Sequence, residues 1–186
     1  MENNDLPRIV KRFTIFAILF FFPSLTFAEN LDSFRGVPFG ASEAEAREKI
    51  PGLKCFDDSL NKVRQCWEMF FRIGEMTIGK PIMIFRNDKL VSANMEFTPA
   101  TYQYLKDVFI KKYGNPSNII EEMVKTKMGA EFKNERTQWH GERVFLEMWK
   151  YKDTLKRGMA IYVTVEGIST MKKENEKSKE KAIKDF

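Results

Sequence analysis

The stretch TPATYQYLKDVFIKKYGNP, residues 98–116, gives the clearest helix signal in this 186-residue chain. Thr98 suits the N-cap position, and Pro99 suits the first helical position, where its missing N–H costs no hydrogen bond. Large apolar residues then recur at helical spacing, at Tyr102, Leu105, Phe109 and Tyr113. Gly114 predicts a left-handed helix end, and Pro116 prevents continuation. One amphipathic helix is therefore predicted near the middle of the chain, and the segments on either side of it decide the fold.

Before this helix, the sequence predicts one short helix and then antiparallel strands. The segment Ser42-Glu43-Ala44-Glu45 has the spacing of a capping box, so a helix should start there and stop at Pro51-Gly52. Apolar and polar residues then alternate, a pattern typical of strands with one buried face. The predicted strands are Val63–Ile73, Pro81–Arg86 and Leu90–Phe97.

After the helix, a similar order returns. The segment Ile119–Lys127 fits a helix or a strand equally well. Further strands are predicted at Lys133–His140, Arg143–Tyr151 and Met159–Val165. Trp67 and Trp139 hold comparable places in the two series. We therefore predict an α+β fold of two tandem helix-plus-antiparallel-sheet units, about residues 31–97 and 98–168.

The N-terminus has the three parts of a secretory signal peptide. Basic residues precede the apolar run Phe13–Phe22, and Thr26-Phe27-Ala28 has the small residues of a cleavage site. The alternative is an uncleaved membrane anchor, but the run is interrupted by Pro23 and is shorter than the roughly 20 apolar residues of a spanning helix. We expect residues 1–28 to be removed and the mature domain, residues 29–171, to be periplasmic.

Cys55 and Cys66 are the only cysteines. In an exported chain, an isolated pair is most simply a disulfide, and this one would close a short loop. A redox or metal-binding pair is the alternative. The spacing is not C-x-x-C, and no further metal ligands are evident nearby, so the sequence favours a structural disulfide.

The formal net charge of +5 does not indicate a nucleic-acid-binding protein. Part of this charge belongs to the signal segment and to the Lys-rich tail, residues 172–186, and the domain between them mixes both signs. The tail has too few large apolar residues to order itself, so disorder is predicted. It could attract the domain to an anionic surface, but the acids interleaved with its lysines favour a solvated terminus.

No residue forms a convincing catalytic or metal-binding motif. His140, the only histidine, falls in a predicted hairpin turn, and no nucleophile segment of the G-x-S-x-G kind accompanies it. Asp57 and Asp58 lack the remaining oxygen ligands of a calcium loop and are interpreted as turn formers. We therefore predict no catalytic, cofactor-binding or metal-ligating residue and no bound cofactor.

The ten methionines are scattered and do not cluster as copper ligands would. Several lie on predicted strand faces, where methionine commonly fills a core: Met69, Met95, Met148 and Met159. Phe70 falls on the other face of its predicted strand, and an exposed phenylalanine there would indicate a protein contact.

The segment Phe34-Arg35-Gly36-Val37-Pro38-Phe39-Gly40-Ala41-Ser42, followed by Tyr113-Gly114-Asn115-Pro116, resembles a set of small exported bacterial proteins of unknown function. The duplicated helix-then-sheet order also resembles β-lactamase inhibitory protein and the small envelope-assembly lipoproteins related to it. This chain lacks the lipid-attachment cysteine of those lipoproteins, and no inhibitor contact residues match it position by position. The resemblance implies a non-enzymatic binding fold and transfers no site residues.

Together these features predict an exported, non-enzymatic binding protein of the cell envelope. Its partner would be another envelope protein or a peptide, recognised through the open face or the edge of a sheet. One alternative is an envelope hydrolase whose site is assembled from distant strands. The other is surface tethering through the Lys-rich tail.

Overall fold

The structure is a computed structural model that describes residues 30–59, 62–69, 71–126, 128–170, 172, 173 and 176. The predicted signal peptide, residues 1–28, lies outside these residues, as do Phe70 and most of the predicted tail. Within the described part of the chain, no helix is long and apolar enough to cross a membrane.

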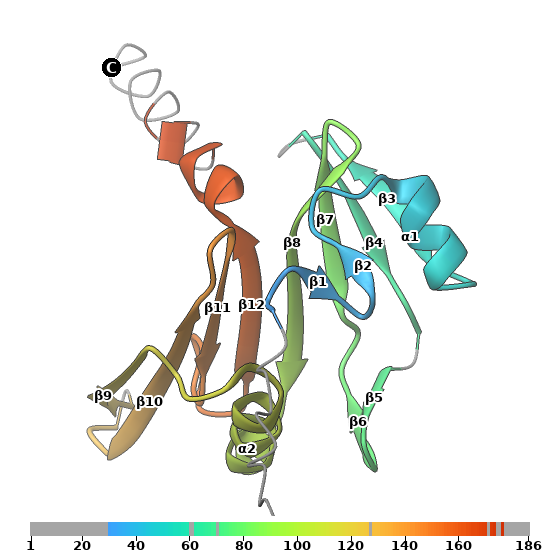
Figure 1. Cartoon of the computed structure of the whole chain (residues 1–186). Coiled ribbons are helices and arrows are strands. Elements are labelled where there is room, and N and C mark those ends of the chain that lie inside the picture. Colours follow the sequence, from blue (N-terminus) through green and yellow to red (C-terminus); the bar gives the residue numbers. More distant parts are fainter. Residues whose placement is uncertain are drawn as a thin grey trace, which may run out of the picture.

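An antiparallel sheet of eight strands forms the body of the molecule (Figure 1). Its spatial order is β3-β4-β7-β8-β12-β11-β10-β9. The strands are β3 (Lys54–Asp58), β4 (Val63–Trp67), β7 (Ile82–Arg86), β8 (Lys89–Phe97), β9 (Asn118–Lys125), β10 (Glu131–His140), β11 (Val144–Trp149) and β12 (Gly158–Thr164). The ambiguous segment after the central helix is thus a strand, β9.

The other elements are two small hairpins and the helices. The hairpins are β1 (Ser33–Phe34) with β2 (Val37–Pro38), and β5 (Phe71–Ile73) with β6 (Met76–Ile78). The helices are α1 (Glu43–Lys49), the 3-10 turn η1 (Pro99–Thr101) and α2 (Tyr102–Tyr113). Helices and antiparallel sheets together confirm the α+β class, and strands predominate.

The order of elements along the chain is regular. α1 precedes β3, β4, β7 and β8, which are neighbours in the sheet in that order. α2 precedes β9, β10, β11 and β12, which are neighbours in the same way. β8 pairs with β12 at the centre of the sheet, so β3 and β9 are its two edges.

The helix ends follow from local signals. The predicted capping box of α1 is confirmed: Glu45 N–H donates to Ser42 Oγ (3.2 Å), and Ser42 N–H donates to Glu45 Oε2 (2.7 Å). α2 ends as predicted at Gly114, which has a φ of 81° and donates its N–H to Ile110 O. The start differs, because η1 precedes α2 and the Thr98 side chain makes no capping hydrogen bond.

One face of the sheet carries the core. Phe109 of α2 packs its ring against Trp139 of β10 and Tyr162 of β12 (ring centroids 5.8 and 6.2 Å apart). The rings of Phe34 and Phe39, from the N-terminal hairpin and its exit, also contact Tyr162, at 5.3 and 6.3 Å. All five side chains are at most 5% exposed. α2 and the β1–β2 hairpin therefore cover the same face of the sheet.

The predicted strand Val63–Ile73 is two strands in the structure. β4 ends at Trp67, and the chain then leaves the large sheet to form β5 with β6. Phe71 is only 8% exposed and lies 6.2 Å from the Phe34 ring, so this departure places Phe71 in the core. Glu68, in the connection, forms an ion pair with Arg35 of the N-terminal hairpin.

Three further sequence interpretations were wrong in part. Asp57 and Asp58 lie within β3 and not in a turn, and their carboxylates accept hydrogen bonds from Arg64 and Gln65 of β4 (both 2.9 Å). Met69 is 47% exposed, whereas Met95 and Met148 fill the core as predicted and Met159 is half-buried. The predicted last strand ends at Thr164, because residues 165–170 are helical.

Candidate functional site

The sheet has a second face, which we call the open face. Side chains directly opposite each other in neighbouring strands share a face. The helix-covered row runs Cys55, Cys66, Met83, Ala93, Tyr162, Leu146 and Trp139. The adjacent rows, displaced by one residue, therefore point to the open face.

Apolar side chains lie on the open face in two groups, one on β4 and β7 and one on β12 and β11, with the polar Ser92 and Asn94 of β8 between them. One row runs Phe56, Gln65, Ile84, Ser92, Val163, Phe145 and His140, and the next runs Trp67, Ile82, Asn94, Ile161, Glu147 and Gln138. Met159 and Trp149 follow in a third row. Figure 1 shows β4, β7, β8, β12 and β11 in one sheet, where they are neighbours in that order.

The open face is far less buried than the helix-covered face. Its apolar residues Trp67, Ile82, Ile84, Phe145, Trp149, Met159, Ile161 and Val163 are all half-buried, and Phe56 is 45% exposed. Met83, Ala93, Leu146 and Trp139, which alternate with them, are at most 2% exposed. Exposed apolar surface of this kind is typical of a protein–protein or ligand contact.

The open face is hollowed at its β11 end. A cavity of about 210 Å³ lies there, lined mainly by apolar side chains of β11 and β12 and by Ile168 from the helical residues 165–170. His140 is at its rim and stacks edge-on against Phe145, with ring centroids 5.0 Å apart. His140 is exposed and is the last residue of β10, next to the predicted turn.

The hollow does not bring His140 together with a nucleophile and two carboxylates. Glu147 is the one carboxylate in the described lining, and it accepts a hydrogen bond from Gln138 Nε2 (2.9 Å) and faces Arg136 (3.5 Å). The hollow thus offers apolar contact area with a hydrogen-bonded polar rim.

Neither family models, nor curated proteins, nor solved structures compared with this chain gave a match.

The predicted disulfide between Cys55 and Cys66 is formed, with a Cα–Cα distance of 4.1 Å. The two residues are directly opposite each other on β3 and β4. This distance of 4.1 Å is slightly shorter than the 4.4–6.8 Å usual for disulfides.

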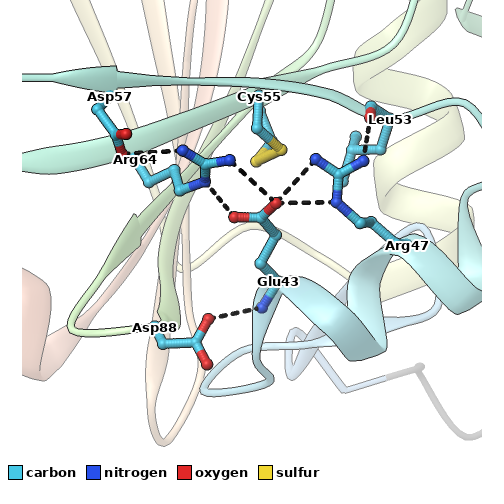
Figure 2. The surroundings of a disulfide bond; sticks show 8 residues. Glu43, Arg47, Leu53, Cys55, Asp57, Arg64 and Asp88 are labelled. Carbon is cyan, nitrogen blue, oxygen red and sulfur yellow. Dashed lines mark hydrogen bonds and ion pairs between the residues drawn. A yellow bond between two sulfur atoms is a disulfide. The ribbon is translucent and has the colours of Figure 1, made fainter.

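An ion cluster surrounds this disulfide (Figure 2). Glu43, at the start of α1, forms ion pairs with Arg47 of the same helix (2.8 Å) and with Arg64 of β4. A carboxylate oxygen of Glu43 lies within 4.8 Å of both sulfur atoms. The Glu43 backbone N–H also donates to Asp88 in the β7–β8 turn (3.0 Å). These bonds anchor α1 to the sheet at β4 and at the β7–β8 turn, so we assign the cluster a structural role.

A second polar cluster fixes α2 against β10. The Tyr102 hydroxyl lies 2.7 Å from Thr137 Oγ1 and 3.1 Å from Glu135 Oε1, and Lys106 Nζ donates to the same Glu135 oxygen (2.6 Å). Burial raises the pKa of Tyr102, so its hydroxyl stays protonated. Burial tends to raise the pKa of Glu135, but the hydrogen bond and charge of Lys106, together with the hydrogen bonds from Tyr102 and Thr137, outweigh burial and hold that pKa below its usual value.

Glu43→Gln should weaken the anchoring of α1. The hydrogen bond and charge of Arg64, with those of Arg47, hold the pKa of Glu43 below its usual value. A carboxylate with a lowered pKa stabilises the fold above its unfolded pKa, and this contribution is lost as the pH falls through the folded pKa. We expect Glu43→Gln to cost about 1 to 2 kcal/mol at pH 7, and less near pH 3.

Urea unfolding of Glu43→Gln and of the unmodified protein, at pH 7 and at pH 3, measures the loss of stability at each pH. Glu48→Gln removes the same charge from the same helix at an exposed position and should cost under about 0.5 kcal/mol. Equal losses for Glu43→Gln and Glu48→Gln would contradict the anchoring role.

The sequence predicted recognition through an open face or an edge of a sheet, but it did not show which residues form that face. Alternation in β4 and β11 showed that each strand has two faces, but both faces contain apolar residues, so the pattern alone does not say which one is covered. Trp67 and Trp139 illustrate this point. Each lies in the second strand of its series, but Trp67 points to the open face and Trp139 into the core.

Proposed function

We propose that this protein is an exported, non-enzymatic binding protein of the cell envelope, which recognises another envelope protein or a peptide through the open face of its sheet. The observation that carries the proposal is the half-buried apolar surface from Trp67 to Trp149, opposite the helix-covered face. Interfaces between proteins are enriched in aromatic residues and methionine, and this surface carries both.

We infer that the chain is a tandem repeat of two helix-plus-sheet units, as in β-lactamase inhibitory protein. The support is the order of elements: a helix followed by four neighbouring strands, twice, with the last strands of the two series paired at the centre. Joining two such units side by side provides one broad sheet surface, which suits recognition of a protein or an extended peptide.

Export to the periplasm is part of the same proposal. It is supported by the signal-like N-terminal segment and by the Cys55–Cys66 disulfide, because disulfides persist in oxidising compartments.

Alanine substitution of the two open-face tryptophans tests the binding surface. Trp67 and Trp149 lie on β4 and β11 and are half-buried. Because tryptophan commonly dominates binding energy at interfaces, we expect Trp67→Ala or Trp149→Ala to reduce partner capture about ten-fold or more. Capture from the envelope fraction, quantified by mass spectrometry against the unmodified protein, gives the measurement.

Tyr104→Ala is the matched control. Tyr104 is an aromatic residue of α2 that is 42% exposed and lies on a helix that covers the opposite face. Tyr104→Ala should leave partner capture unchanged. All three variants should keep the thermal unfolding transition of a folded protein. Partners captured equally by the tryptophan variants and the unmodified protein would show that the open face is not the site.

A further inference from the structure

The two edges of the eight-stranded sheet are different. At the β3 end of the sheet, α1 packs on the helix-covered face, where Glu43 forms an ion pair with Arg64 of β4 (Figures 1 and 2). At the other edge, Figure 1 shows no described element beyond β9. β9 is eight residues long, and most of its side chains are exposed. A long edge of this kind is a template for pairing with another strand.

The backbone groups that β9 offers can be assigned. Thr126 N–H donates to Ala130 O (2.9 Å), so these residues form a hydrogen-bonded pair next to the β9–β10 ladder. Such pairs alternate along an antiparallel ladder. The N–H and C=O groups that point away from β10 therefore belong to Ile119, Glu121, Met123 and Lys125. In the described part of the chain, no hydrogen bond from these four N–H groups to a residue outside the ladder is found.

The side chains of these four residues are self-complementary. Ile119 and Met123 are apolar and are 45% and 58% exposed. Glu121 and Lys125, of opposite sign, lie two residues on either side of Met123. Under a two-fold rotation about Met123, the glutamate of each strand is placed opposite the lysine of the other. All four side chains lie on one face, so the opposed charges are adjacent.

We propose that a second copy of this chain pairs with the β9 edge, antiparallel and centred on Met123. Glu121 then faces Lys125 of the second copy, twice by symmetry, and the two Met123 side chains meet at the axis. The outward N–H and C=O groups of each β9 bond to those of the other. The two eight-stranded sheets join into one, with their open faces on the same side.

The charges already present in each chain extend this pairing. Lys125 forms an ion pair with Glu131 (2.7 Å), and Glu121 forms one with Lys133 (2.7 Å). Across the new contact, the charges therefore alternate in the order Glu131, Lys125, then Glu121 and Lys133 of the second copy. Opposite charges in facing strands stabilise a sheet, and like charges destabilise it.

This alternation also selects the register. Pairing centred on Glu121 would place the two Glu121 carboxylates opposite each other, and pairing centred on Glu122 would do the same for Glu122. Like-charge pairs across an edge are unfavourable, so the Met123-centred register is preferred over these two. The inference concerns the strand edge and does not depend on the open face being a binding site.

Charge reversal with mixing tests the pairing. The full chain, expressed with export and purified, should sediment as a particle of twice the mass of one chain. Lys125→Glu and Glu121→Lys each create two like-charge pairs in the symmetric contact, so each variant alone should sediment as a monomer. An equimolar mixture should recover the dimer, because the first variant is acidic at positions 121 and 125, the second is basic at both, and each acid then faces a base.

Two further variants keep the test decisive if a reversal disturbs folding. Met123→Pro removes an N–H that points away from β10, so it should block dimerisation while the internal ladder remains. Glu142→Lys makes the same charge change as Glu121→Lys, but at an exposed residue of the β10–β11 turn, so it should leave the dimer intact. A wild-type chain that is monomeric at every concentration overturns the proposal, and so does a dimer that persists in both reversed variants and in Met123→Pro.

Discussion

Replacing Tyr162 with alanine should lower the free energy of unfolding by about 3 to 5 kcal/mol, as expected for truncation of a large buried aromatic side chain. Tyr162 is 2% exposed and lies at the middle of the helix-covered face. Its ring contacts aromatic rings of the N-terminal hairpin, of its exit and of α2 (Phe34, Phe39, Phe109 and Tyr113). The cavity left by alanine would remove the ring at which the hairpin, α2 and β12 meet.

Chemical denaturation followed by tryptophan fluorescence measures this loss. Tyr162→Phe is the control, because it keeps the ring and removes only the hydroxyl, which lies 3.3 Å from the Tyr113 hydroxyl. It should cost no more than about 1.5 kcal/mol. If Tyr162→Ala costs as little as Tyr162→Phe, the ring is not the centre of the core.

Removing the disulfide should have the second largest effect. Cys55→Ala with Cys66→Ala opens a link between residues 11 apart in sequence, which in the chain-entropy model costs about 2 to 3 kcal/mol. For a chain of this size, that loss corresponds to a fall of about 5 to 10 °C in Tm. The fold should survive, because the core around Tyr162 lies several strands away from the β3–β4 edge.

Calorimetry of the double variant, and of the unmodified protein with and without a reductant, gives the comparison. Reduction should shift Tm of the unmodified protein downward and leave Tm of the double variant unchanged. A reduced protein with an unchanged Tm would refute the structural role, and a redox function for the pair would then have to be considered.

Most of the secondary structure could be predicted from the sequence, because the signals for it are local. The capping box before α1 and the glycine after α2 act through hydrogen bonds between residues within four positions of each other, so the sequence alone predicted both helices. Period-two alternation likewise predicted most strands of the large sheet. The predicted strand Val63–Ile73 was wrong in part, because the chain leaves the large sheet after Trp67 and Phe71 enters the core. The burial of Phe71 depends on its contact with the ring of Phe34, which is distant in the sequence.

The candidate site was less predictable, since it depends on which side of the sheet is covered. The open face follows from the register between eight strands and from the placement of α1, α2 and the N-terminal hairpin on the other side. No short segment carries that information. Phe145 and Leu146 are adjacent apolar residues of one strand, and only their cross-strand partners decide that Leu146 is fully buried and Phe145 is not.

By itself, the sequence determined the α+β class, the two helices, most of the strands and the Cys55–Cys66 disulfide, because each rests on local spacing or on residue type. Only the tertiary structure decided the order of strands in the sheet, the face to which each tryptophan points and which strands form its two edges. These features depend on contacts between segments far apart in the chain. A strand of given pattern can lie in either orientation until its neighbours fix it.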